Sequence, residues 1–415
     1  MYNNEDFNTF YEKAYLLFPI FNGRLIDLES RLNEMKELVR TAGAEVVGYG
    51  FQVLREISPA TIFGSGKIEE MLAEVREKGA NLIIFDGELS PSQAQNLSNC
   101  FDGLKFIDRT ALILDIFALN AKTKEGKLQV ELAQHEYILS RLKGQGEALS
   151  RLGGGIGTRG PGETKLETDR RYIRSRIKNL KLQLEELTRK RTLASDRRER
   201  TNVITVALAG YTNAGKSTLL NALSGSDVLA EDKLFATLDP THRRISVGRF
   251  DVVLIDTVGF IKDIPTNLIN AFKSTLDSVK HADLILNVCD ATGDWEKQNQ
   301  VTETVLKELN ANSPILKVFN KCENIKDFTN FPNDAIFISA KYNLGLENLK
   351  SAISEVFKDD FVNCKLKLDF SEINEFYKVK DFIENFSVEY KDEYVEINLC
   401  IKKIYFSKIS SLIKD

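Results

Sequence analysis

Residues 203–223 read VITVALAGYTNAGKSTLLNAL. The stretch begins as an apolar, β-branched strand, passes through a glycine-containing loop and ends as a helix, which is the context that a phosphate-binding loop requires. The loop lets successive backbone N–H groups face a phosphate, and the helix N-terminus adds its positive end. Lys216 is expected to reach the β- and γ-phosphates, and the Ser217 hydroxyl to bind Mg²⁺. We therefore predict a P-loop nucleotide-binding domain.

The residues downstream of this loop favour GTP over ATP. Asp256-Thr257-Val258-Gly259 follows the apolar strand 251–255, so its carboxylate can hold Mg²⁺ through water and its glycine can offer an N–H to the γ-phosphate. Asn320-Lys321-Cys322-Glu323 and Ser339-Ala340-Lys341 close two further apolar strands. A carboxylate after the Asn-Lys pair accepts from guanine N1–H and from its exocyclic amine, a donor pair that adenine lacks. In this order, the motifs predict a GTPase.

Together these motifs define a predicted site for GTP or GDP and Mg²⁺. The second hydroxyl ligand of the metal is expected to be Thr237 in FATLD (235–239), with Thr241 as the alternative. The predicted metal ligands are Ser217, Thr237 and Asp256, and the predicted catalytic groups are Lys216, Thr237 and Gly259. The full set of predicted nucleotide contacts is Gly210, Tyr211, Thr212, Asn213, Ala214, Gly215, Lys216, Ser217, Thr218, Phe235, Ala236, Thr237, Leu238, Asp239, Asp256, Thr257, Val258, Gly259, Asn320, Lys321, Cys322, Glu323, Ser339, Ala340 and Lys341.

The composition of the whole chain limits which classes of protein it can belong to. Its 415 residues are 43% hydrophobic and 28% charged, enough apolar mass and length for two to four domains. No apolar run approaches the roughly 18 residues of a membrane span, and the start lacks a basic stretch followed by an apolar one. We therefore expect a cytoplasmic protein. The scattered cysteines disfavour a zinc site and are expected to be small buried hydrophobic side chains; they are Cys100, Cys289, Cys322, Cys364 and Cys400.

The net charge of −4 conceals an uneven distribution. Residues 141–200 hold 17 Lys and Arg against 8 Asp and Glu, a local balance of +9, so the rest of the chain carries −13. Such an asymmetry suggests an anionic partner for the basic part, most simply nucleic acid. A solvated, charged helical hairpin explains the same charge equally well.

The first hundred residues alternate between strands and helices. Residues 44–53, 81–86 and 105–108 have the pattern of strands, residues 66–78 have that of a helix, and Pro91 can open another helix. This alternation predicts a small α/β domain over roughly 20–108.

After Thr110 the period changes to that of packed helices. Apolar positions recur at steps of 4 and 3 in two runs, which predicts an antiparallel helical hairpin; the runs are Leu128, Leu132, His135, Leu139, Leu142 and Ile173, Ile177, Leu180, Leu184, Leu187. Residues 151–165 (RLGGGIGTRGPGETK) are expected to form the joining loop, because six glycines fall in ten positions. Its exposed N–H groups and basic side chains favour a loop that binds phosphate, of a nucleotide or of an RNA backbone, over a plain linker.

The last part of the chain suggests a small α+β appendage. We expect a strand at KLKLDF (365–370), a helix over 373–386, and strands in SVEY (387–390) and EYVEINLCI (393–401). Its aromatic side chains are expected to form its core and not an RNA-stacking surface; they include Phe370, Phe376, Tyr377 and Phe386.

The motif set resembles the translation-factor-related GTPases, and specifically the HflX family. The stretches that carry this resemblance in the nucleotide domain are GYTNAGKS (210–217), LFATLDPTHRR (234–244), DTVGFIKDIP (256–265) and NKCE (320–323). Earlier stretches are similar to the family too; they are PATIFGSGKIEE (59–70), DGELSPSQAQNL (86–97), IDRTALILDIFALNAKTKEGKLQVELAQ (107–134) and RLGGGIGTRGPGETKLETDRR (151–171). The resemblance covers about residues 20–355.

The resemblance implies a multidomain α/β chain. Its parts would be an N-terminal α/β domain (1–108), a basic helical hairpin (109–200) and a P-loop GTPase domain with a mostly parallel sheet (201–360). The α+β appendage (361–415) lies outside the resemblance and is expected from its own residue pattern. It also implies association with the large ribosomal subunit and, in several members, dissociation of stalled or idle ribosomes. Contacts with ribosomal RNA would then fall to the hairpin and its loop 151–165. We expect a monomer without membrane insertion, and leave peripheral association at a membrane open.

Two residues depart from common GTPase patterns. Phe260 stands directly after Gly259, where many GTPases place the glutamine that orients the attacking water. This substitution agrees with the family and predicts slow intrinsic hydrolysis, with the missing group supplied by a partner or another loop. Glu323 stands where the family has Asp, and its extra methylene shifts the reach of the carboxylate. We expect GTP to remain the preferred nucleotide by a smaller margin.

Two other functions stay open at this stage. One is a nucleotide-gated binding module that acts by occupying a surface, in which hydrolysis only resets binding. The other is RNA remodelling driven by ATP bound at residues 151–165 or at GSGK (64–67). That tetrapeptide lacks the spacing of a P-loop and is expected to be a turn.

Overall fold

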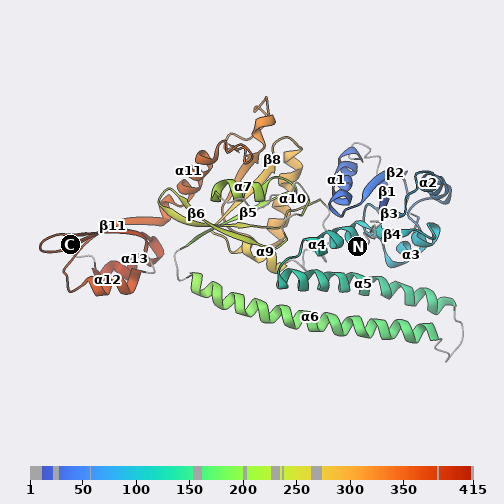
Figure 1. The fold of residues 1–415 in the computed structure, drawn as a ribbon, viewed down its shortest axis with the longest axis horizontal. Coiled ribbons are helices and arrows are strands. Elements are labelled where there is room, and N and C mark those ends of the chain that lie inside the picture. Colours follow the sequence, from blue (N-terminus) through green and yellow to red (C-terminus); the bar gives the residue numbers. More distant parts are fainter. Residues whose placement is uncertain are drawn as a thin grey trace, which may run out of the picture. The chain divides into compact units, whose positions relative to one another are not determined.

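The computed structural model describes the chain except for residues 1–11, 22–27, 57, 153–160, 200–202, 226–233, 236–237, 263–272, 381–382 and 413–415. By its internal contacts the chain divides into two compact units. Unit 1 comprises Met1–Leu184 with Lys233–Ala236 and Asp263–Phe272, and unit 2 comprises Glu185–Asp232, Thr237–Lys262 and Lys273–Asp415. In the described ranges, the named strands form three sheets, of four, six and three strands (Figure 1).

The first sheet is parallel throughout and lies in unit 1. Its strands are β1 (Lys13–Phe21), β2 (Glu45–Leu54), β3 (Leu82–Phe85) and β4 (Lys105–Asp108), in the order β2-β1-β3-β4. The last three match the strands expected from the sequence. β1 was not expected, yet it is a central strand whose seven inner residues are all buried. A strand buried on both faces loses the alternation that marks a half-buried one.

Four helices accompany this sheet: α1 (Leu28–Thr41), α2 (Ser65–Glu77), α3 (Pro91–Cys100) and α4 (Arg109–Asn120). The Ser90 hydroxyl accepts from Gln93 N–H at the start of α3, and Pro91 fills the first helical position, as its fixed φ favours. GSGK (64–67) is not the expected turn, because Gly64 is the N-cap of α2 and the next three residues are helical.

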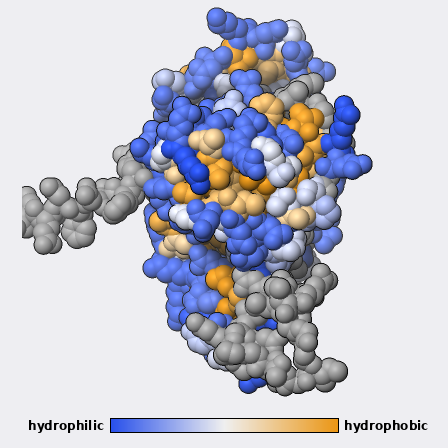
Figure 2. Space-filling view, turned by 90° about the vertical axis from the view of Figure 1, so that its right-hand side faces the viewer, coloured by the Kyte–Doolittle hydropathy of each residue, from blue (hydrophilic) through white to orange (hydrophobic). Residues whose placement is uncertain are grey.

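β2 is an edge strand with apolar side chains in solvent. Tyr49, Phe51 and Val53 alternate along it and are between 37% and 43% exposed. Figure 2 shows one face of the molecule, with hydrophobic surface gathered in its middle and hydrophilic surface around it.

Two long helices follow α4 as an antiparallel hairpin, as predicted (Figure 1). They are α5 (Lys124–Leu152) and α6 (Pro161–Glu199). Arg176 Nε donates to Glu131 at 2.7 Å, and the Arg170 guanidinium donates to the Leu142 carbonyl at 2.6 Å. Leu128 and Leu132 on α5, and Ile173 and Leu180 on α6, are buried members of the predicted seam.

The predicted joining loop is too long at both ends. Residues 151–152 are still in α5, and residues 161–165 already belong to α6. Pro161 opens α6 because the first helical position needs no N–H partner. The prediction gave more weight to the number of glycines than to this proline, which signals the start of a helix. Residues 153–160 lie outside the described residues.

Buried ion pairs connect the carboxyl ends of the first sheet to the helices. Asp108, at the end of β4, pairs with Arg141 and accepts from the Tyr137 hydroxyl at 3.0 Å, both on α5. Arg109 pairs with Asp86 at 2.9 Å and with Glu34. Removing one partner of such a pair leaves a buried charge uncompensated, so these contacts strongly constrain where α5 can lie on this domain.

The second sheet forms the nucleotide domain in unit 2. Its strands are β5 (Ile204–Gly210), β6 (Thr241–Val247), β7 (Phe250–Asp256), β8 (Leu284–Asp290), β9 (Ile315–Asn320) and β10 (Ile336–Phe337), in the order β10-β9-β8-β5-β7-β6. All neighbours are parallel except β6 and β7. The helices are α7 (Lys216–Ser224), α9 (Lys273–Lys280), α10 (Trp295–Glu308) and α11 (Leu346–Val356). The carboxyl end of β5 is a topological switch point, where ligands of such sheets bind.

A cluster of aromatic rings packs beside β9. Trp295, the only tryptophan of the chain, stacks on Phe331 at a ring distance of 5.6 Å. Its ring also meets Phe319 edge-on at 5.3 Å. Phe319 is completely buried and directly precedes Asn320.

The third sheet forms the C-terminal α+β part that the sequence predicts. Its antiparallel strands are β11 (Phe361–Leu368), β12 (Ile383–Tyr390) and β13 (Val395–Lys402), in the order β11-β13-β12, with α12 (Ile373–Val379) and α13 (Phe406–Ile409). The expected helix over 373–386 is too long, because Ile383–Phe386 belongs to β12. Phe376 and Phe386 join the core, but Phe370 is 51% and Tyr377 46% exposed, contrary to expectation.

The cysteines are less uniform than predicted. All are free thiols; Cys289 and Cys400 are buried, and the other three are half-buried. Burial raises the pKa of the Cys289 thiol to about 12. Among the residues that the structure describes, no helix is both long and apolar enough to cross a bilayer.

Candidate nucleotide-binding site

The loop between β5 and α7 has the backbone of a P-loop. Asn213 and Gly215 both have positive φ, at 58° and 90°. A Cβ on Gly215 would lie 2.2 Å from the Asn320 amide nitrogen, so the close approach of these two residues requires glycine. The loop therefore has its predicted form, with the N-terminus of α7 directly behind it.

Lys216 is enclosed by this loop. Its ammonium donates to the carbonyls of Gly210 and Tyr211 at 3.1 and 2.8 Å. The side chain is buried, and this burial lowers the pKa of Lys216 to about 8, against a smaller opposing effect of Asp256. The Lys216 ammonium, which is predicted to meet the phosphates, therefore loses its proton more readily than that of an ordinary lysine.

Two of the three predicted metal ligands lie together. Ser217 Oγ donates to Asp256 Oδ2 at 2.7 Å, which joins the first turn of α7 to the end of β7. Hydroxyl and carboxylate oxygens are ligands that Mg²⁺ prefers, so the pair fits the predicted ion. Thr257 Oγ1 instead donates to the buried Leu208 carbonyl at 2.6 Å, a structural contact with β5.

Asn320 joins three of the predicted loops. Its Nδ2 donates to the Ala214 carbonyl in the P-loop at 2.9 Å, and its Oδ1 accepts from Ala340 N–H at 3.0 Å. Ser339 is buried, and its hydroxyl accepts from Tyr342 N–H at 3.2 Å. The P-loop and the two predicted guanine-reading loops are therefore held together by one side chain that is 3% exposed.

Asp290 is a member of this site that the sequence analysis did not include. Its carboxylate pairs with Lys321 Nζ at 2.7 Å. Lys321 has a φ of 65°, a conformation that leads directly into the short 3₁₀ turn Cys322–Asn324. The sequence feature that could have identified Asp290 is its position as an acidic residue at the carboxyl end of β8, next to the strand that ends in Asn320.

The segment 234–239 is divided between the two units. Phe235 belongs to unit 1, where its carbonyl accepts from Asn120 Nδ2 at 2.8 Å and its ring meets Phe117 edge-on at 4.8 Å. Leu234 N–H donates to Thr41 Oγ1 at 3.3 Å. Ala236 and Thr237 lie outside the described residues. The alternative ligand Thr241 is the first residue of β6 and pairs in register with Asp256.

Phe260 lies against the P-loop. Its N–H donates to the Gly210 carbonyl at 3.0 Å, and its carbonyl accepts from Thr212 N–H at 2.7 Å. The Tyr211 hydroxyl accepts from Lys262 N–H at 2.9 Å. Phe260 is 2% exposed, so its side chain is buried and not presented to solvent.

Three family models match consecutive parts of the chain. "GTP-binding GTPase N-terminal" matches residues 29–118, "GTP-binding GTPase Middle Region" residues 120–198 and "50S ribosome-binding GTPase" residues 205–321. They follow the order of the first sheet, the hairpin and the nucleotide domain. These matches agree with the fold class and with a GTPase.

Several curated proteins named GTPase HflX are similar over most of their length. That of Caldanaerobacter subterraneus subsp. tengcongensis is 53% identical over 80% of this chain and 78% of its own. That of Lacrimispora saccharolytica is 41% identical over 96% of each chain, and that of Escherichia coli strain K12 is 42% identical over 82% of each. The P-loop geometry, the family models and these relatives agree: the chain belongs to the HflX family of GTPases.

Proposed function

We propose that this GTPase binds the large ribosomal subunit and dissociates or rescues stalled or idle ribosomes. The observation that carries the proposal is the match of residues 205–321 to the model described as "50S ribosome-binding GTPase", in a chain whose segment 141–200 has a charge of +9. A ribosomal surface presents mainly RNA phosphate, and a basic segment binds it through release of counterions. We propose a cytoplasmic monomer as the working form.

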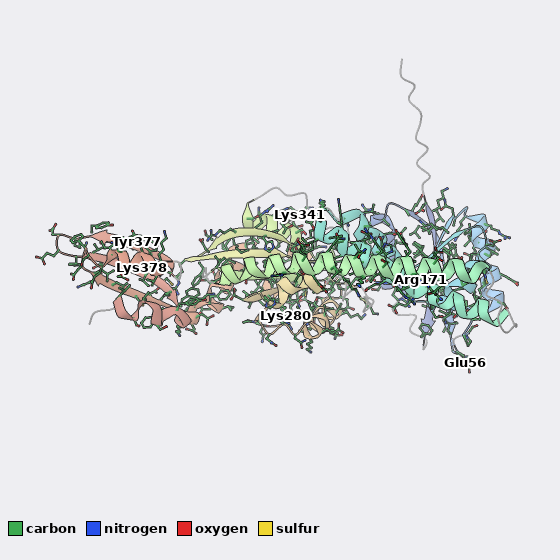
Figure 3. The ribbon with its side chains drawn as sticks, turned by 90° about the horizontal axis from the view of Figure 1, so that it is seen from below. Glu56, Arg171, Lys280, Lys341, Tyr377 and Lys378 are labelled. Carbon is green, nitrogen blue, oxygen red and sulfur yellow. The ribbon has the colours of Figure 1, made fainter. Side chains whose placement is uncertain are left out.

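The exposed side of α6 supports an RNA-binding role for the hairpin. Arg171, Arg174 and Lys178 are exposed on it, and Arg171 is labelled in Figure 3. Tyr172 among them is 68% exposed. Basic side chains position a protein on the phosphate backbone, and an exposed aromatic ring offers a stacking surface to an unpaired base. The glycine-rich segment 151–165 is proposed as a second RNA contact.

In the nucleotide site, the proposed roles follow the predicted motifs. Lys216 and the P-loop N–H groups would bind the β- and γ-phosphates, and Gly259 N–H the γ-phosphate. Ser217, Asp256 and Thr237 would hold Mg²⁺, which when bound neutralises charge on the phosphates. Asn320, Lys321 and Glu323 would bind the guanine base, with Asp290 fixing Lys321 by its ion pair.

Phe260 makes the isolated site incomplete for hydrolysis. Its side chain has no hydrogen-bonding group, so it cannot orient the water that attacks the γ-phosphate in line. The proposed consequence is slow turnover by the protein alone and stimulation by the large subunit, which would supply or position the missing group.

A nucleotide-gated binding module is the second candidate, and the same feature favours it. With Phe260 at this position, hydrolysis could serve only to reset binding. The two candidates differ in what a slowly hydrolysed GTP analogue supports. The gated module predicts one full round of ribosome dissociation with the analogue, whereas a hydrolysis-driven reaction predicts binding without dissociation.

The first test is GTP turnover by the purified protein, alone and with large ribosomal subunits. Strong stimulation is expected, together with its loss in Lys216→Ala. Lys280→Ala is the matched control, because Lys280 is an exposed lysine in the last turn of α9 (Figure 3). Subunit binding without stimulation would favour the gated module, and absence of binding would overturn the proposed partner.

A further inference from the structure

Thr212 in the P-loop carries a buried hydroxyl group. The residue is 6% exposed, and its Oγ1 makes no hydrogen bond with any residue that the structure describes. Its backbone N–H, in contrast, donates to the Phe260 carbonyl at 2.7 Å. Burying an unpaired hydroxyl costs free energy that a valine side chain of the same shape would not cost. The hydroxyl therefore does not contribute to the stability of the loop.

Two other buried threonines of unit 2 have the usual arrangement. Thr257 is completely buried, and its hydroxyl donates to the Leu208 carbonyl at 2.6 Å. Thr302 is completely buried too, and its hydroxyl donates to the Gln298 carbonyl at 3.0 Å. Most buried side-chain polar atoms have such a partner, and an exception requires an explanation such as a catalytic role. Thr212 is an exception in a loop that is predicted to bind phosphate.

The Thr212 side chain lies beside the two residues that are proposed to bind the γ-phosphate. A Cβ built on Gly259 would lie 2.8 Å from Thr212 Cγ2 and 3.0 Å from Lys216 Nζ. Both side chains therefore approach Gly259 closely, and all three residues belong to unit 2. Oγ1 and Cγ2 are bonded to the same carbon of Thr212, so the hydroxyl lies in the same small region as the Lys216 ammonium and Gly259.

We propose that Thr212 is a catalytic residue whose hydroxyl orients the water that attacks the γ-phosphate of GTP. The proposal rests on the proposed roles of Lys216 and Gly259 at that phosphate. Phe260 has no hydrogen-bonding side chain, so the water needs another acceptor, and Thr212 Oγ1 is a buried acceptor next to Gly259 without a partner among the described residues. A hydroxyl can accept from the water and donate to a γ-phosphoryl oxygen at the same time.

Thr212 takes part in the reaction without changing its balance. The water oxygen forms a bond to the γ-phosphorus, the bond from this phosphorus to the β–γ bridging oxygen breaks, and its electron pair leaves with GDP. The protons of the water pass to the released phosphate, which exchanges them with solvent. Thr212 keeps its own proton and holds the water in line with the bond that breaks, and correct orientation of a reactant lowers the barrier.

This assignment changes what the large ribosomal subunit has to provide. With an acceptor for the water already in the P-loop, the subunit would place existing groups and would not supply a catalytic group of its own. Stimulated hydrolysis should then depend on Thr212 as much as hydrolysis by the protein alone does. A group supplied by the subunit would instead make the stimulated rate independent of Thr212.

Thr212→Val tests the hydroxyl, because it keeps the shape of the side chain and removes only its polar group. Single-turnover hydrolysis of saturating GTP should slow by about tenfold or more, with and without large subunits, as expected for one lost hydrogen bond in the transition state. The affinities for GDP and for a slowly hydrolysed GTP analogue, measured by titration calorimetry, should stay within about twofold, because the lost contact is made in the transition state.

Two further variants and one further measurement separate catalysis from structure. Thr212→Ser keeps the hydroxyl and should retain most of the turnover. Thr304→Val is the matched control, because Thr304 is exposed on α10 and its hydroxyl donates to the Gln300 carbonyl of the same helix at 2.8 Å. Without nucleotide, hydrogen exchange in α7 should be no faster in Thr212→Val than in the unmodified protein, because the substitution breaks no hydrogen bond.

The outcomes separate failure of this assignment from failure of the proposed function. Unchanged turnover in Thr212→Val, or full stimulation by the large subunit, would overturn the role of the hydroxyl and leave the nucleotide site intact. Faster exchange in α7, or an equal loss of nucleotide affinity and of turnover, would also overturn it, because the hydroxyl would then act in folding or in binding. Absence of GTP hydrolysis by the unmodified protein would overturn the proposed function and the assignment with it. Slow turnover with unchanged affinity, restored in Thr212→Ser, would establish Thr212 as catalytic.

Discussion

At the scale of single residues, the lowered pKa of Lys216 predicts that nucleotide binding depends on pH. Burial lowers this pKa to about 8, whereas phosphate oxygens stabilise the charged ammonium and raise it again in the complex. Above about pH 8, binding should therefore take up as much as one proton. Affinity should fall as pH rises, by at most about tenfold per pH unit.

Calorimetry in two buffers with different ionisation enthalpies measures this proton uptake. At about pH 9 a substantial fraction of a proton should be taken up per GDP bound. At about pH 7 the lysine is already charged in the free protein, so its contribution should be small. Proton-neutral binding at both values would contradict this pH dependence.

Glu323 provides a second prediction at this scale. Glu323→Asp restores the shorter side chain of the usual guanine motif, so the affinity for GDP should rise by about fivefold if one hydrogen bond improves by about 1 kcal/mol. ATP should then compete less well with labelled GDP. Glu347→Asp, on the exposed side of α11, is the control and should change neither. A fall in GDP affinity would mean that the glutamate is already the better fit.

The sequence predicted individual site residues unequally. Ser217 and Asp256 were expected together and lie 2.7 Å apart. Asn320 was expected at the base, but its bonds to Ala214 and Ala340 could not be read from a motif, because they depend on the spacing of neighbouring strands. The Tyr211 contact with Lys262 was missed because it joins residues 51 positions apart.

At the scale of elements, the hairpin seam gives a prediction about stability. Leu180 on α6 is completely buried, whereas Leu182, two residues on, is 54% exposed. Leu180→Ala should destabilise the hairpin by about 2–5 kcal/mol through lost contacts and the cavity that remains. Leu182→Ala, the matched control, should cost less than about 0.5 kcal/mol.

Local opening of α5 and α6, measured by hydrogen exchange, is the suitable readout. A chain with two units need not unfold in a single step, so a global melting temperature would mix several transitions. Similar effects of the two substitutions would contradict a seam that includes Leu180.

Element prediction succeeded where the hydrophobic period was clear and failed where a buried context hid it. β2, β3, β4 and the two hairpin helices follow their expected periods. β1 was missed because all of its inner residues are apolar. The helix predicted over 373–386 was too long because IENF (383–386) fits either a helix or a strand, and pairing with β13 selects the strand.

At the scale of the whole molecule, the charge distribution predicts how ribosome binding depends on salt. Replacing Arg171, Arg174 and Lys178 by Gln should weaken binding to the large subunit and flatten its salt dependence. The logarithmic slope should decrease by about one for each lost phosphate contact. Binding is measured by sedimentation at several salt concentrations.

A variant of equal charge change serves as the control for this prediction. Lys365, Lys367 and Lys391 lie in the C-terminal part, and their replacement by Gln should leave the slope unchanged. If both triple variants lowered the slope equally, net charge and not the hairpin would determine binding.

The fourfold domain division expected from the sequence stays a prediction, whereas the internal contacts divide the chain into two units.

The aromatic cluster beside β9 has a practical consequence. Trp295 is the sole tryptophan, and it contacts Phe319, the residue before Asn320. Indole emission excited at long wavelength therefore originates from this one position, next to the strand that leads into the proposed guanine loop. A change in the local environment when the base binds would alter the intensity or the emission maximum. We therefore expect Trp295 to act as an intrinsic optical probe that follows nucleotide exchange in real time without a dye on the ligand or the chain.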